Sequence, residues 1–169
     1  MNTVPPLSGT GDTLPDEKRV PGSWERFLAA RTSDTFCAAW LALICEKFPV
    51  VRQAAALIES ADGQAFVPIA VWPTVNADMA RMGAAVQRAL GERRIVLLPA
   101  DGQPGVLHVA LPVSVNERMV GAVVLEAVAE TKDVAPLLRE LHWGSAWLSN
   151  LLGKRELDAA TEANARSMG

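Results

Sequence analysis

The sequence has few cysteines, few histidines, no excess of positive charge and no long apolar run. Its 169 residues include two cysteines, and no apolar stretch reaches the ~20 residues that a membrane span requires. On one helix, Cys37 and Cys45 would lie roughly 12 Å apart, too far for a disulfide between them. With neither a disulfide framework nor a signal peptide, we expect a cytoplasmic location, and membrane attachment only through a longer parent protein.

The charge balance and the histidine content disfavour two further kinds of site. The formal net charge is −3 and the pI is about 5.4, so we expect no nucleic-acid partner, which would require a concentrated basic face. His108 and His142 have no acidic pair spaced beside them, so we expect no metal site and no cofactor. What remains is a chain that is half hydrophobic and long enough for one domain with tails.

Composition divides the chain into three regions. Residues 1–22 contain four prolines and little apolar periodicity, so we predict a disordered tail there. Residues 23–152 carry the helical and strand periodicities, so we predict a single folded domain. Residues 153–169 are polar and rich in alanine, which predicts a C-terminal extension or a linker helix.

The domain is centred on an apolar hairpin at residues 107–128. Two apolar arms flank the polar tip Asn116–Arg118, which predicts two antiparallel strands joined by a short loop. Both arms carry apolar residues at odd and even positions alike, which predicts helices on both faces of the sheet. Pro112 has no N–H and must lie at a strand end, an edge or a bulge, and Gly121 indicates a kink or close backbone approach.

The predicted fold class is therefore α+β, an antiparallel sheet with helices on both faces. Ser33 or Asp34 is the predicted cap of the first helix and Asn76 that of the next, while Asp62-Gly63 predicts a tight turn between strands. The predicted elements besides the hairpin are helices at 33–48, 76–90 and 133–152 and strands at 53–60, 66–72 and 95–98.

The last predicted helix carries two indoles that point away from its inward face. Its leucines form an inward stripe at helical spacing, and Trp143 and Trp147 project more than ~90° away from that stripe. Exposed indoles usually mark a contact surface.

We therefore predict a homodimer through the first and last helices, which are expected to pack together within each chain. The small residues Ala38, Ala39 and Ala42 of the first helix offer room beside the indoles. In the alternative, the segment Trp24–Leu28 folds over the indoles within a monomer.

The order of these elements and three runs of residues resemble a GAF domain. The runs are 54–63, with its Asp-Gly turn, 109–113, which reaches Pro112, and 119–126, which contains Gly121. The resemblance covers roughly residues 33–152 and makes the domain at 23–152 GAF-like. Two further runs, 36–41 and 141–148, resemble the cytoplasmic N-terminal GAF region of bacterial HlyD-type periplasmic adaptor (membrane-fusion) proteins, which serve secretion or efflux pumps.

The resemblance implies a non-enzymatic sensory or scaffold domain that dimerises and can bind a small molecule between the sheet and the helices on one face. We place such a ligand near Trp72, Met79, Met82 and His108. Methionine at helical spacing is more often part of a core, and a strand histidine is more often simply hydrogen-bonded. Glu126 is expected to be paired or to lie at an edge.

An enzyme of the same family is the alternative. Free methionine sulfoxide reductases use cysteines in strands and loops of the pocket, whereas no cysteine follows Cys45 in this chain. Bilin attachment is disfavoured because both cysteines lie on the first helix, and the Asn-Lys-Phe-Asp-Glu set of cyclic-nucleotide binders is absent. A purely structural dimerisation module is a further alternative.

Overall fold

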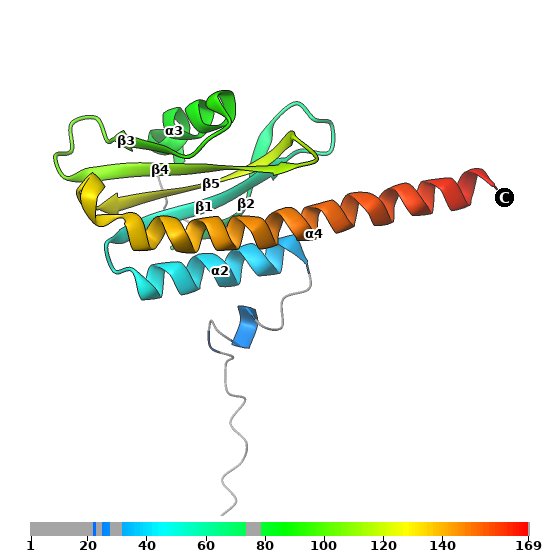
Figure 1. Ribbon diagram of the computed structural model, residues 1–169, viewed down its shortest axis with the longest axis horizontal. Coiled ribbons are helices and arrows are strands. Elements are labelled where there is room, and N and C mark those ends of the chain that lie inside the picture. The colour runs from blue at the N-terminus through cyan, green and yellow to red at the C-terminus, as the bar shows by residue number, and fades with distance from the viewer. Residues whose placement is uncertain (1–21, 23–24, 28–31, 74–78, 169) are drawn as a thin grey trace, which may run out of the picture.

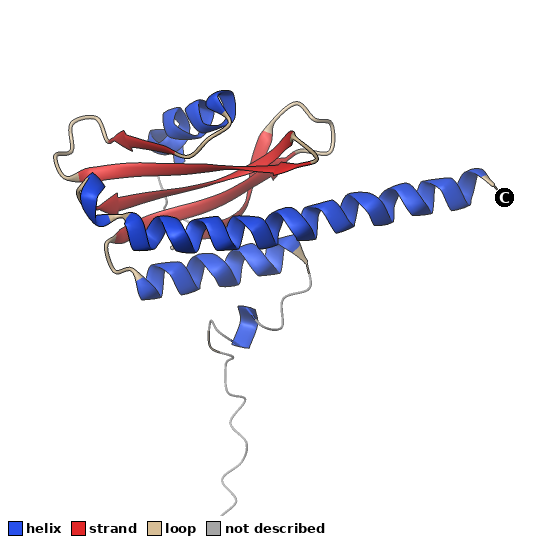
Figure 2. Ribbon diagram, in the orientation of Figure 1, coloured by secondary structure: helices blue, strands red, loops and turns tan. Residues whose placement is uncertain are grey.

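A five-stranded antiparallel sheet lies between one helix on one face and two helices on the other (Figures 1 and 2). This computed structural model describes residues 22, 25–27, 32–73 and 79–168. The predicted α+β class with helices on both faces is confirmed. The predicted disordered tail, apart from Gly22, and the predicted cap Asn76 lie outside the described residues.

All five predicted strands form, with ends that lie within two residues of the predicted ones. They follow the spatial order β2-β1-β5-β4-β3, and each neighbouring pair is antiparallel. The central β5 therefore pairs on both sides, with β1 and with β4. The strands are β1 (Val51–Glu59), β2 (Phe66–Trp72), β3 (Val96–Pro99), β4 (Val106–Val115) and β5 (Arg118–Val128).

The β4–β5 hairpin turns in two residues. Asn116 and Glu117 both have positive φ, 49° and 66°, as two-residue hairpin loops require, and Arg118 already belongs to β5. The close backbone approach predicted at Gly121 is present: the backbone of β1 lies so near that a Cβ built on Gly121 would overlap the carbonyl oxygen of Leu57. Pro112 lies beyond the part of β4 that β3 pairs with, so it occupies an edge position on that side of the strand, as predicted.

Both faces of the sheet are dry, as the doubled apolar pattern predicts. Alternate residues of β4 and β5, including Val109 and Leu125, pack with α2 (Ser33–Lys47) and α4 (Ala135–Ser167). The residues between them, including Ala110 and Val124, pack with α3 (Met79–Glu92). Two separate cores result, one on each face.

The start of α2 differs by one residue from the prediction. Thr32, and neither Ser33 nor Asp34, is the cap: its side chain accepts a hydrogen bond from Thr35 N, and the Thr35 side chain accepts one from Thr32 N. Ser33 is instead buried in the first turn. Thr35 takes the position that Glu or Gln holds in most capping boxes, which is why the sequence pattern did not reveal the cap.

The predicted end of the last helix near Leu152 is wrong. A 3₁₀ turn at Thr131–Asp133 leads into α4, which is 33 residues long and continues through Gly153 to Ser167 (Figure 1). A glycine inside a helix costs about 1 kcal/mol relative to alanine, and the good helix formers that follow it offset this cost.

No helix in the described part of the chain is both long and apolar enough to span a membrane.

Candidate functional site

The outer face of the α2–α4 pair carries the most exposed aromatic surface among the described residues. Trp143 and Trp147 are 50% and 48% exposed, and their rings pack edge to face with centroids 6.1 Å apart. The prediction that both indoles point away from the core is confirmed. They form an aromatic patch that the sheet does not cover.

A groove of about 390 Å³ runs beside the indoles, between α2 and α4. Apolar side chains line most of it, and the Lys47–Glu140 ion pair bridges the two helices within its lining. The lining residues are Phe27, Trp40, Leu43, Ile44, Glu46, Lys47, Glu140 and Trp143.

Phe27 covers part of this surface from within the same chain. Its ring lies 5.3 Å from the Phe36 ring and 5.8 Å from the Trp143 ring, centroid to centroid. This contact agrees with the alternative in which the segment before α2 folds over the indoles. Trp24 and Leu28 of that segment lie outside the described residues.

The small residues of α2 are only partly available to a partner. Ala38 is exposed and Ala42 is half-buried, but Ala39 is 3% exposed and packs inward. The prediction that Ala39 contributes to the dimer surface is therefore corrected: α2 is rotated on the sheet so that position 39 joins Phe36 and Trp40 on the buried side.

The close fit of α2 and α4 depends on Gly144. A Cβ built there would overlap the Trp40 indole, so the absence of a side chain at this position of α4 makes room for a ring of α2. Trp40 is 2% exposed, and its Nε1 finds no hydrogen-bond partner among the described residues. The fit of ring to backbone determines how closely the two helices approach.

On the opposite face of the sheet, a buried pair of ionisable groups lies among apolar side chains. His108 Nε2 lies 2.8 Å from Glu126 Oε2, and both side chains are 6% exposed. Residues 108 and 126 are direct partners in the β4–β5 register, on the α3 side of the sheet. This confirms that Glu126 is paired. His108 is hydrogen-bonded within the sheet, as expected of a strand histidine that has a structural role.

The four predicted ligand residues do not come together. Met79 and Met82 pack with the α3-side core, and Met82 is fully buried. His108 shares that face. Trp72 is the partner of Ala54 and packs with the core under α2 and α4. A site that includes Met82 therefore cannot include Trp72, because strand alternation places the indole on the other face.

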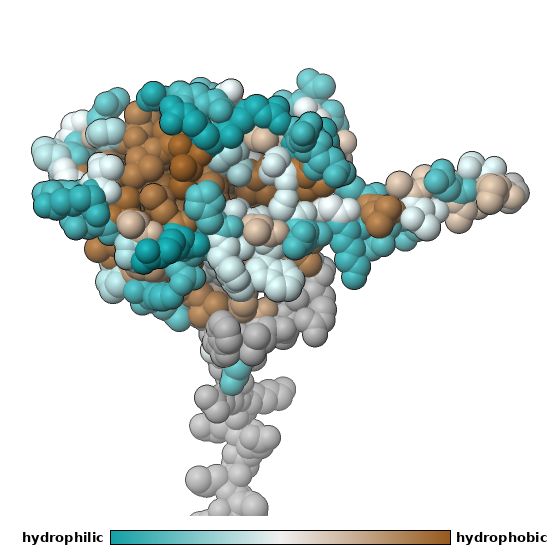
Figure 3. Space-filling model, viewed as in Figure 1, coloured by the Kyte–Doolittle hydropathy of each residue, from teal (hydrophilic) through white to brown (hydrophobic). Residues whose placement is uncertain are grey.

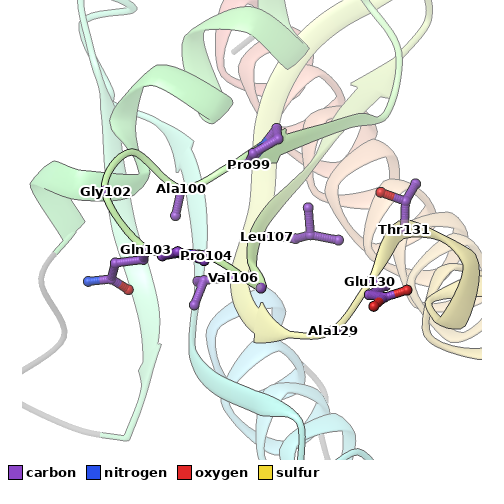
Figure 4. A pocket seen from close by; sticks show the side chains of 11 residues that line it. Pro99, Ala100, Gly102, Gln103, Pro104, Val106, Leu107, Ala129, Glu130 and Thr131 are labelled. Atoms are coloured by element: carbon purple, nitrogen blue, oxygen red, sulfur yellow. The ribbon is translucent and has the colours of Figure 1, made fainter.

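A further hollow of about 440 Å³ lies at the end of the sheet (Figure 4). The β3–β4 loop lies on one side of it and the turn after β5 on the other, and Leu107 lies between them. None of the predicted site residues lines it. The only signal in the sequence is the Gly/Pro-rich loop at 101–105.

Apolar side chains also gather between α3 and α4 on the face seen in Figure 3. Leu97 and Leu98 of the short edge strand β3 are partly buried, and Pro99, which has no backbone N–H, ends that strand.

Among the described residues, no three His, Cys, Asp or Glu side chains lie close enough to hold a metal ion.

Both cysteines lie on α2, on the face of the sheet opposite α3. Cys37 and Cys45 are 0% and 5% exposed, and burial raises the pKa of each thiol to about 12 from an ordinary 9.0. The thiolate is the reactive form, so a shift of this size lowers its fraction at neutral pH roughly a thousandfold.

We therefore expect the native protein to resist a thiol reagent at neutral pH and to react at both cysteines only after unfolding in guanidinium. An Ala160→Cys variant, with its new thiol on an exposed part of α4, is the control and should react at once at that one site. Fast labelling of Cys37 or Cys45 in the native protein would contradict this prediction and favour thiol chemistry.

Comparison with known proteins supports the fold. No family model and no curated protein matches the sequence, but solved structures do. A GAF domain from an Acinetobacter phosphoenolpyruvate-protein phosphotransferase matches with a TM-score of 0.62 and 10% identity, over 80% of this chain and 90% of that one. The described part of the chain thus has the GAF fold.

Two further structures show how varied proteins with this fold are. Residues 122 to 287 of a methyl-accepting chemotaxis protein match with a TM-score of 0.59 and 11% identity, over 80% of this chain and 98% of that one. Free methionine-R-sulfoxide reductase from Neisseria meningitidis, in complex with its substrate, matches with a TM-score of 0.59 and 11% identity, over 80% and 91%. Likeness at this identity establishes the fold alone.

Proposed function

We propose that this chain is a non-enzymatic sensory or scaffold domain that forms a homodimer through the outer faces of α2 and α4. The observation that carries the proposal is the half-exposed indole pair of Trp143 and Trp147 beside an apolar groove. The GAF domain and the segment of a methyl-accepting chemotaxis protein with the same fold support a sensory role. A small ligand, where one binds, lies between the sheet and α3.

The resemblance of residues 36–41 and 141–148 to HlyD-type adaptors supports a more specific role. In that role the domain is the cytoplasmic regulatory part of a secretion or efflux adaptor, and a longer parent protein provides the link to the membrane. A reductase, the class to which one of the similar structures belongs, would need a reactive thiol beside a pocket. The burial of both cysteines on α2 argues against that chemistry.

Burial of the indoles supplies the driving force for the dimer. Each tryptophan has roughly 150–250 Å² to bury, and about half of it is already covered. At ~25 cal/mol per Å², covering the rest of both rings contributes about 4–6 kcal/mol per chain before the entropic cost of association. In a two-fold dimer each copy contributes the same patch, so this contribution counts twice.

We expect the wild-type protein to sediment as a dimer at tens of micromolar, and the Trp143→Ala/Trp147→Ala variant to sediment as a monomer. Val128→Ala is the matched control, because Val128 is similarly exposed, at 40%, but lies at the end of β5. A wild type that is monomeric would reject the dimer and favour the closed form in which the segment around Phe27 covers the indoles.

A further inference from the structure

The last helix leaves the domain at a defined position. Leu152 is the last buried residue of α4, and a Cβ on Gly153 would make ordinary contact with Val115. From Lys154 to Met168 every residue is exposed, and Figure 1 shows this part of α4 extending past the sheet. We call residues 154–167 the projecting segment.

The tip of the β4–β5 hairpin holds the start of the projecting segment. Arg118, the first residue of β5, forms ion pairs with Glu59 on β1 and with Glu156 on α4. Roughly two turns earlier, Ser149 of α4 donates a hydrogen bond to the carbonyl oxygen of Ser114. The helix is thus tied to the hairpin on both sides of the point where it leaves the domain.

The same tip is also tied to α3 on the other face of the sheet. Arg93 follows the last residue of α3 and has a φ of 55°, so the chain turns sharply there. Its guanidinium donates a hydrogen bond to the carbonyl oxygen of Glu117. Glu117 and Arg118 are adjacent, so one short turn connects the end of α3 to the start of the projecting segment.

We propose that the β4–β5 hairpin tip couples the position of α3 to the direction of the projecting segment, with Arg118 as the positioning residue. A shift of the end of α3 displaces the Glu117 carbonyl, and with it the guanidinium that binds Glu156. Exposed ion pairs contribute little to stability, so the Arg118–Glu156 pair can open while the domain stays folded. The two arrangements, held and released, are the states that coupling between distant sites requires.

The coupling rests on the proposed sensory function for its biological role, but the experiment that tests it does not depend on formation of the dimer. Spin labels at Gln87→Cys on α3 and Ala160→Cys on the projecting segment report their distance distribution by double electron–electron resonance. Both positions are exposed. Dilution with unlabelled protein removes distances between copies, so a failed dimer prediction and a failed coupling prediction are distinguishable.

Two variants and two matched controls test the link. Glu156→Gln removes one partner of Arg118, while Glu162→Gln removes a charge whose partner in the described part of the chain, Arg166, lies on α4 itself. Arg93→Asn removes the guanidinium from the Glu117 carbonyl but suits the positive φ. Arg94→Asn removes the neighbouring charge, which pairs with Glu92.

We expect Glu156→Gln and Arg93→Asn each to lower the ratio of held to released conformations about two- to fivefold, the range for loss of an exposed ion pair or hydrogen bond. Both controls should keep the wild-type distribution. An unchanged distribution in Glu156→Gln would overturn the role of Arg118. A broadened distribution in Glu156→Gln with no change in Arg93→Asn would overturn the coupling to α3.

Discussion

Glu126→Leu is expected to destabilise the protein by about 3 kcal/mol, whereas the double variant His108→Leu/Glu126→Leu should recover most of that loss. The single change leaves a buried imidazole with no carboxylate 2.8 Å away, and the desolvation of that ring is then uncompensated. The double change replaces both polar groups by apolar ones of similar size on a face already lined by Ala110 and Val124.

Urea unfolding of the four proteins in this double-mutant cycle measures the coupling energy between the two side chains, which we expect to exceed about 2 kcal/mol. Glu92→Leu is the control, since Glu92 pairs with Arg88 and Arg94 on the surface and its removal should change stability little. Additive losses from the two single changes would show that the pair is not coupled and that each group is stabilised by other neighbours.

Gly144→Ala is expected to lower the free energy of unfolding by about 2 kcal/mol, although alanine is intrinsically the better helix former. The added methyl would overlap the Trp40 indole. That ring is 2% exposed and stacks on Phe36 with centroids 5.9 Å apart, so a shift of the ring would weaken that contact. Otherwise the α2–α4 distance must increase, and contacts along both helices weaken.

A second glycine of the same helix provides the matched control. Gly153→Ala places its methyl at ordinary contact distance from Val115, so here helix propensity should prevail and stability should rise by up to about 1 kcal/mol. Trp40→Phe in the Gly144→Ala background removes the indole atoms that the methyl meets and should restore part of the loss. Equal effects of the two Gly→Ala changes in urea unfolding would contradict this account.

The sequence predicted the site less well than it predicted the fold. The indoles of Trp143 and Trp147 could be placed on an outer face because the leucine stripe of their helix occupies the inner one. Met79 and Met82 could likewise be assigned to one helix. Trp72 could not be placed, because the residue lies on a strand with apolar neighbours on both sides, and only its pairing with Ala54 determines which face it takes.

Side-chain period and turn chemistry act between residues near one another in the chain. They are enough to predict the sheet with two dry faces and the short turn at the polar tip Asn116–Arg118. The hydrogen bond between His108 and Glu126 and the packing of Trp40 over Gly144 are apparent only in the folded chain. These contacts depend on strand register and on the rotation of each helix against the sheet, which many distant packing contacts set together.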